Sequence, residues 1–205
     1  MRIFSVDLER SGGGVTQNFT TQIGVCVLDS TLFDANHPEK CIISTFSEYL
    51  CQPENTSWEE DCVKRFWEKN PTLYEKTKEG ILSADPLAID RFVEWVDQHK
   101  DPDPKNNLLI SDYSAFDFVC LAQLLANHRS LLYLFGEYEQ TPLDTTSYYL
   151  GLQRRNVPET NTWYSRNSYK DAPDFRKLLS LENHDAGADA TAIGLNFLWV
   201  SSNIA

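Results

Sequence analysis

The sequence opens with a short apolar run that ends in two acids spaced two residues apart. The run Ile3-Phe4-Ser5-Val6 leads into Asp7-Leu8-Glu9, and this pattern predicts a buried strand. Because strand side chains alternate between faces, Asp7 and Glu9 should point to one side and Leu8 to the other. Two carboxylates on a buried strand repel each other, so water, a hydrogen-bond network or a cation must compensate. We favour a hard divalent cation, Mg²⁺ or Mn²⁺, over the alternative of two solvated acids at a strand end.

The overall charge is strongly negative. The 205 residues carry a formal net charge of −12 at pH 7, and their number suits a single domain covering 1–205. Such a charge argues against broad binding to duplex DNA, where Lys and Arg supply most of the affinity. It leaves room for a compact nucleic-acid site held by metal ions, because cations change the local sign of the field.

The cysteines and the N-terminal residues indicate an intracellular protein. The chain has five cysteines and no Cys-x-x-Cys pair, which favours a reduced setting, cytoplasmic or nuclear, over a disulfide framework or a zinc site. The apolar run after Arg2 is interrupted by Asp7, unlike the core of a signal peptide. No apolar stretch approaches the length of a transmembrane helix, so we expect no membrane partner.

The order of the expected elements places the two acids in a mixed sheet. Three strands at about 3–9, 21–28 and 41–50 are joined by turn-rich connections, which suggests an antiparallel meander. A fourth strand at 108–110 then alternates with helices. The fold class is therefore α/β, with helices packed on the sheet. Helices are expected at about 57–68, 86–99, 115–127, 142–152, 173–181 and 185–200, a short strand at 133–135 and a long surface loop at 154–172.

A third acid stands where an apolar helix should begin. Asp117 lies among Phe116, Phe118 and Leu121. Acids favour helix N-termini, where the helix dipole stabilises them by about 0.3–1 kcal/mol. Asp112 can take that capping role, and this leaves Asp117 for a functional one.

A histidine and a fourth acid lie near the expected start of the last helix. In an ideal helix the five positions from His184 to Asp189 turn by about 500°, which leaves the two side chains roughly 140° apart. If both serve one site, His184 must precede the helix and Asp189 must lie in its first turns. The small residues Ala186, Gly187 and Ala188 would allow another element to approach closely. Taken alone, His184 would be read as an ordinary surface histidine.

The three patterns together resemble the motifs of the DEDDh 3′–5′ exonucleases. The family's motifs match here as Asp7-Leu8-Glu9, Phe116-Asp117 and His184-x₄-Asp189, in that order. The segment Pro142-Leu143-Asp144-Thr145 also resembles the family's stretch between its second and third motifs. The resemblance extends over nearly the whole chain and implies a ribonuclease H-like fold.

The resemblance also implies a mechanism. Four carboxylates are expected to hold two divalent cations, Mg²⁺ or Mn²⁺, about 3.5–4 Å apart. These ligands are Asp7, which should bridge the ions, Glu9, Asp117 and Asp189. His184 is expected to be the general base that takes a proton from the attacking water. The implied partner is a nucleic acid, a single-stranded DNA or RNA 3′ end, and the implied products are nucleoside 5′-monophosphates.

Three further residues are expected to contact the substrate. Leu8 and Arg10 should flank the terminal nucleotide, with Arg10 able to reach a phosphate, and Phe116 should stack on or beside the terminal base. Many relatives have Thr or Met in place of Arg10, and many have Asn in place of Asp112. These departures bear on substrate choice more than on chemistry.

Three other functions are left open by the sequence. One is a catalytically silent exonuclease fold that serves as an interaction module, although all five catalytic positions are filled. A second is a phosphoesterase with Asp7 as nucleophile, which would need a phosphate-binding loop or a lysine nearby that the sequence does not show. The third is an acidic structural protein with solvated carboxylates, from which burial of Asp117 would distinguish the enzyme.

Overall fold

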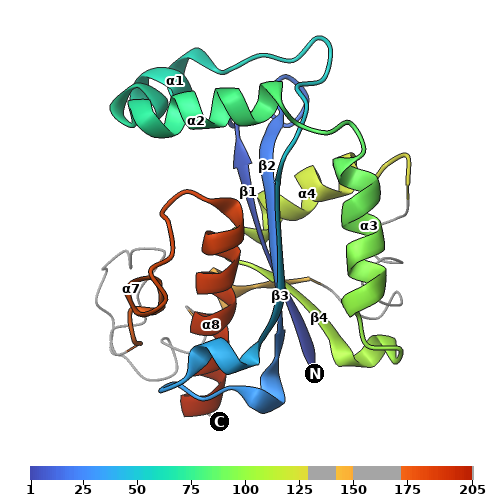
Figure 1. Ribbon diagram of the computed structural model, residues 1–205, viewed down its shortest axis with the longest axis vertical. Coiled ribbons are helices and arrows are strands. Elements are labelled where there is room, and N and C mark those ends of the chain that lie inside the picture. Colours follow the sequence, from blue (N-terminus) through green and yellow to red (C-terminus); the bar gives the residue numbers. More distant parts are fainter. Residues whose placement is uncertain (129–141, 150–171, 205) are drawn as a thin grey trace.

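The computed structural model describes residues 1–128, 142–149 and 172–204, in which helices cover both faces of a twisted sheet (Figure 1). The expected strand at 133–135 and nearly all of the expected loop at 154–172 lie outside the described residues. The sheet has five strands in the order β3-β2-β1-β4-β5. Their bounds are Arg2–Arg10 for β1, Thr20–Asp29 for β2, Ile42–Tyr49 for β3, Asn107–Ser111 for β4 and Leu143–Asp144 for β5.

The pairing confirms the predicted meander followed by alternating strands and helices. β1 pairs with β2, and β2 with β3, in antiparallel fashion, whereas β4 is parallel to both β1 and β5. Within β1, only residues 2–5 pair with β4. The second half of β1, which carries Asp7 and Glu9, therefore runs on beyond β4, past the point where the chain turns into helix α4 (Ser114–Leu124).

The two faces of β1 bury different residues, as the alternation predicted. Phe4, Val6 and Leu8 belong to a core shared with α4 and with helix α3 (Ala88–His99). Ile3 belongs to a second core under helix α8 (Ala186–Ile204). By the same alternation Asp7 and Glu9 lie on the α8 face. The acids thus point toward the helix that carries Asp189.

The N-terminus of α8 lies very close to the sheet. A Cβ atom on Gly24 would come within 1.9 Å of the carbonyl carbon of Ala186, and one on Gly187 within 2.7 Å of the Ser47 Cβ. Such contacts are impossible for larger residues. Gly24 therefore allows the backbones of β2 and α8 to touch, and Gly187 allows α8 to approach the side chains of β3. The close approach expected from the small residues around Asp189 is confirmed.

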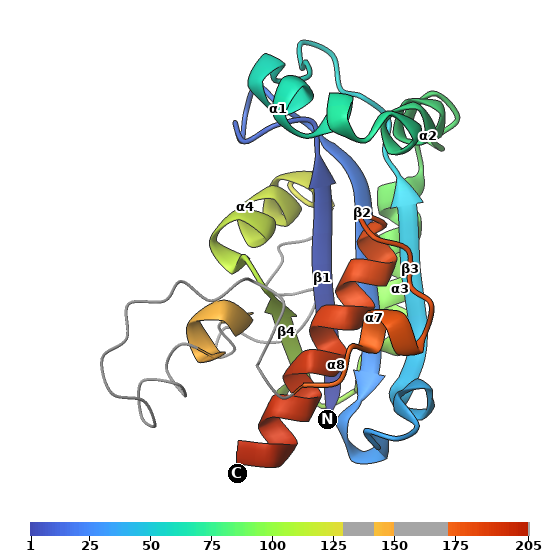
Figure 2. The same cartoon turned by 90° about the vertical axis from the view of Figure 1, so that its left-hand side faces the viewer.

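The region after β3 differs from the expected single helix. Helix α1 covers only Glu60–Arg65, and a second helix, α2, which the sequence analysis missed, covers Pro71–Leu82. The N-cap position of α1 is Glu59, with no side-chain capping hydrogen bond, and Ser57 lies before the helix, where its carbonyl accepts hydrogen bonds from Ser11 and Asn18. A short 3₁₀ turn at Trp67–Lys69 separates the two helices. Figures 1 and 2 show α1 and α2 lying across the end of the sheet where β1 finishes.

Two further helix boundaries shift for reasons of hydrogen bonding. The expected helix at 86–99 begins at Ala88, and Asp85 accepts a hydrogen bond from the Leu87 amide in the preceding turn at 2.9 Å. The expected helix at 142–152 starts later, since Leu143 and Asp144 pair with Ile110 and Ser111 as β5. Residues 145–149 are helical. Pairing with a distant strand thus outweighs the local preference for a helix start.

The C-terminal helices lie close to their expected places. Helix α7 is shorter than expected, covering Phe175–Leu178, and α8 extends to Ile204. Among the residues that the structure describes, no helix has both the length and the apolar character needed to cross a membrane.

Candidate active site

Four carboxylates from three elements converge at the end of β1. Asp7 and Glu9 come from β1, Asp117 from the first turn of α4 and Asp189 from the first turn of α8. Burial, then the negative charges of Glu9, Asp117 and Asp189, raise the pKa of Asp7 well above its ordinary value. The acids that the sequence analysis selected therefore share one electrostatic environment.

Glu9 is likewise buried among other negatively charged side chains. Burial and the charges of Asp189 and Asp185 raise the pKa of Glu9 to about 8, and Arg176 opposes the shift. Within the described residues no hydrogen bond or ion pair reaches the carboxylate of Asp7 or Glu9. Oxygen ligands with uncompensated negative charge are the donor set that Mg²⁺ and Mn²⁺ prefer, so these residues fit a divalent cation.

Asp117 is held from the end of β4. Its side chain is only 4% exposed and accepts a hydrogen bond from the Ser111 hydroxyl. The cap of α4 comes from Asp144, not from Asp112 as expected: its carboxylate accepts hydrogen bonds from the Ser114 amide at 2.9 Å and the Ser114 hydroxyl at 2.8 Å. Because Asp117 is buried and another acid caps the helix, it is not a solvated surface acid.

The start of α8 has the geometry that the spacing of His184 and Asp189 required. His184 precedes the helix with a left-handed φ of 58°. Asp185 accepts a hydrogen bond from the Ala188 amide at 3.0 Å and so caps the helix. Gln22 on β2 donates to Asp185 at 2.8 Å and accepts from the Ala186 amide at 3.3 Å. Gln22 was not predicted as a site residue, although a polar residue inside an apolar strand is a signal for one.

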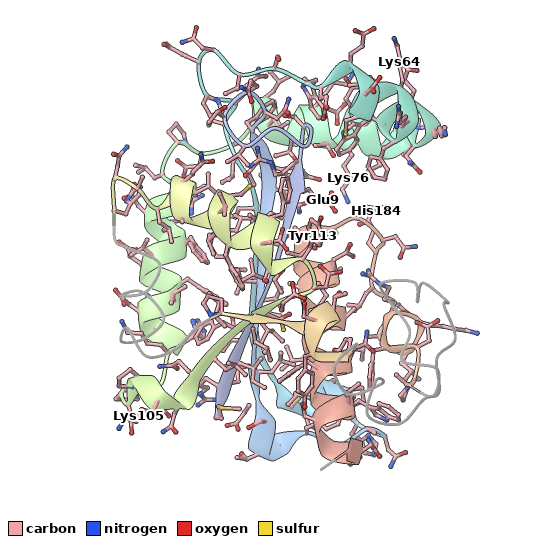
Figure 3. The ribbon with its side chains drawn as sticks, turned by 180° about the vertical axis from the view of Figure 1, so that it is seen from behind. Glu9, Lys64, Lys76, Lys105, Tyr113 and His184 are labelled. Atoms are coloured by element: carbon pink, nitrogen blue, oxygen red, sulfur yellow. The ribbon has the colours of Figure 1, made fainter. Side chains whose placement is uncertain are left out.

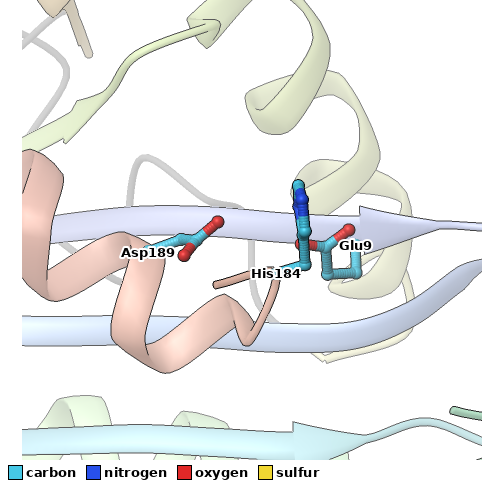
Figure 4. A group of neighbouring side chains, drawn as sticks. All are labelled: Glu9, His184 and Asp189. Carbon is cyan, nitrogen blue, oxygen red and sulfur yellow. The ribbon is translucent and has the colours of Figure 1, made fainter. Parts of the chain in front are cut away.

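These elements bring a histidine and two acids together. Side-chain ligand atoms of Glu9, His184 and Asp189 all lie within 4.8 Å of one another (Figure 4). His184 is exposed, in contrast to the acids beside it. Asp7 and Asp117 are not members of this group of three, and they are linked to it through the charge interactions that raise the pKa values of Asp7 and Glu9.

The region of α1 and α2 holds the His184 loop in two places. The ring of Phe66, which follows α1, meets the His184 ring edge-on, with centroids 4.9 Å apart and planes at 81°. Lys76 of α2 forms an ion pair with Glu182 at 2.8 Å. Figure 3 shows Lys76 and His184 on the same side of the molecule as Glu9 and Tyr113. Neither Phe66 nor Lys76 was predicted from the sequence.

Of the three residues expected to contact the substrate, Leu8 and Arg10 are buried and Phe116 is partly exposed. Leu8 is 7% exposed and packs in the core with α3 and α4. Arg10 is also buried; its guanidinium donates to the carbonyls of Gly14 and Asn18, each at 2.9 Å. Its carbon centre lies 5.3 Å from the centroid of the Phe116 ring, on the partly exposed side of α4. Arg10 therefore fastens the loop after β1 in this structure, which differs from the expected phosphate contact.

A cavity of about 560 Å³ opens beside Asp189 and His184. Arg176 of α7 lines it and forms an ion pair with Asp189. Sequence reasoning had no signal for Arg176, because the pair joins two helices across a turn. The remaining lining residues are Asp112, Thr145, Tyr149, Ala172, Pro173, Asp174, Phe175, Asn183, Ala192, Ile193 and Asn196.

The fold matches solved nucleases over nearly the whole chain, whereas in sequence no family model and no curated protein matches. The nuclease domain of 3′hExo, a DEDDh family member solved with rAMP, is 14% identical with a TM-score of 0.59 over 99% of this chain and 93% of that one. Cell-death related nuclease 4 is 12% identical with a TM-score of 0.61, over 98% of this chain and 64% of that one. Pop2p of S. pombe, solved with Mg²⁺ and Mn²⁺, is 16% identical with a TM-score of 0.56, over 98% and 83%.

The coverage and the sheet order agree with this likeness. The chain spans less than two thirds of nuclease 4 and almost all of the 3′hExo domain. The sheet has the order β3-β2-β1-β4-β5, and it confirms the mixed sheet expected from the sequence, in which an antiparallel meander is followed by strands alternating with helices. The chain has the ribonuclease H-like fold of the DEDDh 3′–5′ exonucleases.

Proposed function

We propose that this chain is a metal-dependent 3′–5′ exonuclease that releases nucleoside 5′-monophosphates from single-stranded DNA or RNA. The observation that carries the proposal is the convergence of four acids from β1, α4 and α8 next to an exposed histidine. Burial and the neighbouring carboxylates raise the pKa values of Asp7 and Glu9, because too little positive charge lies nearby to balance the acids. A structural protein would gain nothing from such a cluster, because buried like charges cost stability.

The acids suit two divalent cations. Asp7, Glu9, Asp117 and Asp189 would hold them, and Mg²⁺ or Mn²⁺ would supply charge neutralisation at the phosphate and a lowered pKa for water. Pop2p, which shares the fold, was solved with both ions. Asp117 is oriented for this role by Ser111.

His184 serves as the general base. A water oxygen attacks the phosphorus of the terminal phosphodiester, and His184 accepts the water's proton. The bond from phosphorus to the 3′-oxygen of the preceding nucleotide breaks, and that oxygen takes a proton from solvent water to become the new 3′-hydroxyl. The imidazolium that results is stabilised by Glu9 and Asp189, whose oxygens lie within 4.8 Å of the His184 nitrogen. The phosphate stays on the 5′-oxygen of the released nucleotide. The rAMP with which 3′hExo was solved is a nucleoside monophosphate.

The α4 side of the site offers aromatic surface to a base. Tyr113 is 50% exposed, and its ring centroid lies 6.2 Å from that of Phe116. Aromatic rings stack on bases of any sequence, which suits a single strand with its bases unpaired. We also propose the reducing cytoplasm or nucleus as the setting, in which the five free cysteines stay reduced.

The test is digestion of single-stranded DNA and RNA oligonucleotides labelled at the 3′ or the 5′ end, with Mn²⁺, with Mg²⁺ and with EDTA. Loss of the 3′ label as a mononucleotide, together with gradual shortening of the 5′-labelled strand, is expected with metal and not with EDTA. The preferred strand identifies the sugar. Absence of cleavage with either metal would overturn the proposal in favour of a silent interaction module.

A further inference from the structure

One of the four carboxylates forms an ion pair with a basic side chain of the protein. Arg176 on α7 forms an ion pair with Asp189, and both side chains are largely buried, at 24% and 14% exposure. Arg176 also opposes the rise in the pKa of Glu9 that burial and the neighbouring acids cause. Its positive charge therefore acts on two of the carboxylates that would hold a divalent cation.

We propose that Arg176 is an internal cation that neutralises Asp189 in the metal-free protein and must release it when a divalent cation binds, so that Arg176 sets the affinity of the metal site. This inference rests on the proposed metal site and adds its regulation. The ion pair and the metal use the same carboxylate. Whatever free energy the pair contributes to the metal-free protein is therefore subtracted from metal binding.

The surroundings of Arg176 allow its side chain to move while its backbone stays in place. Phe175, its neighbour, is 1% exposed and packs in the core under α8. Asp174 caps the helix by accepting a hydrogen bond from the Lys177 amide at 3.1 Å. The cavity of about 560 Å³ that Arg176 lines gives the released guanidinium room beside Asn183 and His184.

Two effects of opposite sign follow from removal of the charge. Without Arg176 the acids repel each other more strongly, so the metal-free protein should lose stability. The same repulsion, now without a competing guanidinium, should make the site bind a cation more tightly. A residue that only supported the fold would lower stability and would not tighten metal binding.

The experiment compares Arg176→Gln with Lys177→Gln, the same loss of charge one residue further along α7. The Lys177 side chain is exposed and makes no ion pair among the described residues. Mn²⁺ binding is measured by calorimetry on the metal-free full chain at pH 8 under argon, and its effect on the melting temperature is recorded in parallel. Arg176→Gln should bind Mn²⁺ more tightly than the unmodified chain by on the order of tenfold, a factor that corresponds to 1.4 kcal/mol. Lys177→Gln should change the affinity by less than about twofold.

Each outcome has a definite meaning. Equal Mn²⁺ affinity in the two variants, or weaker binding by Arg176→Gln, would overturn the role of Arg176 and leave the exonuclease proposal standing. If the unmodified chain binds no Mn²⁺, the metal site and the inference fail together. Should Arg176→Gln not fold, Arg176→Met and Arg176→Lys take its place: the first should tighten binding, whereas the second, which keeps the charge, should resemble the unmodified chain.

Discussion

Gly24 on β2 lies directly beneath Ala186, the first residue of α8, with room for no side chain: a Cβ on Gly24 would be 1.9 Å from the Ala186 carbonyl carbon. Gly24 is also the strand partner of Asp7. The contact of the two backbones therefore places the helix that carries Asp189 above the strand residue that carries the central acid of the site.

Replacing Gly24 should damage the fold and the site together. Gly24→Ala forces α8 away from β2, and the overpacking should lower the free energy of unfolding by about 1–3 kcal/mol or more. Urea denaturation measures the loss. Gly13→Ala is the control, since its new Cβ would have its nearest neighbour at 3.7 Å. An equal loss in both variants would contradict the close packing described for α8.

Asp7→Asn should abolish hydrolysis and stabilise the metal-free protein. The carboxylate is lost as a metal ligand, so the rate should fall by about a thousandfold or more. Loss of one buried charge relieves the repulsion that raises the pKa of Asp7, so the melting temperature without metal should rise. Nuclease assays and thermal melts on the same preparation check both signs. Asp61→Asn, at the exposed surface of α1, should change neither quantity.

The stability of the metal-free protein should fall as the pH rises. The pKa of Glu9 is raised from its ordinary 4.5 to about 8 in the folded chain, so folding favours the protonated form. That stabilisation is complete below pH 4.5 and is lost as the pH rises through 8. The Glu9 contribution to the free energy of unfolding should decrease by on the order of a few kcal/mol across this window.

Glu9→Gln isolates this contribution, because glutamine cannot ionise. In urea denaturation at pH 5 and pH 8 the variant should show a smaller decrease than the unmodified chain, and Glu54→Gln, an exposed position, should leave the decrease unchanged. Excess Mg²⁺ should reduce the decrease in the unmodified chain. A pH dependence that Glu9→Gln leaves intact would show that other groups are responsible.

His184→Ala should slow the chemical step while leaving the metal ligands in place. Loss of a general base lowers rates by about 10²–10⁴-fold. Mn²⁺ affinity should stay within a few-fold of the unmodified chain. Full activity of a folded His184→Ala variant would remove the histidine from the mechanism.

Phe66 should act through His184. Phe66→Leu removes the edge-on contact at 4.9 Å, and the freed imidazole should lower kcat by about tenfold with little change in KM. Leu82→Ala, at an 87% exposed position of α2, is the control. In the background of His184→Ala, Phe66→Leu should have no further effect on kcat. Additive losses in the double variant would show that Phe66 acts independently of the histidine.

The parts of the site that follow from local sequence were predictable. The alternation around Leu8 placed Asp7 and Glu9 on one face, and the rotation between His184 and Asp189 placed one before the helix and the other within it. The meander and β4 followed from runs of β-branched and apolar residues. These properties depend on the period of a strand or helix, which the sequence states directly.

Contacts between distant segments were not predictable in the same way. Arg10 carries a charge that local reasoning assigned to a phosphate, and only the fold shows that the carbonyls of Gly14 and Asn18 receive its hydrogen bonds. Arg176 and Phe66 meet Asp189 and His184 across turns or over more than a hundred residues. The strand at Leu143–Asp144 depends on its pairing with β4, which outweighs the local preference for a helix.

The most direct test of the central claim is the mass of the product released from an unlabelled single-stranded oligonucleotide by the unmodified chain and by Asp7→Asn, each with Mn²⁺. With the unmodified chain we expect nucleoside 5′-monophosphates that accumulate in order from the 3′ end, and with the folded variant we expect none. Nucleoside 3′-monophosphates, internal fragments, or equal release by Asp7→Asn would contradict it.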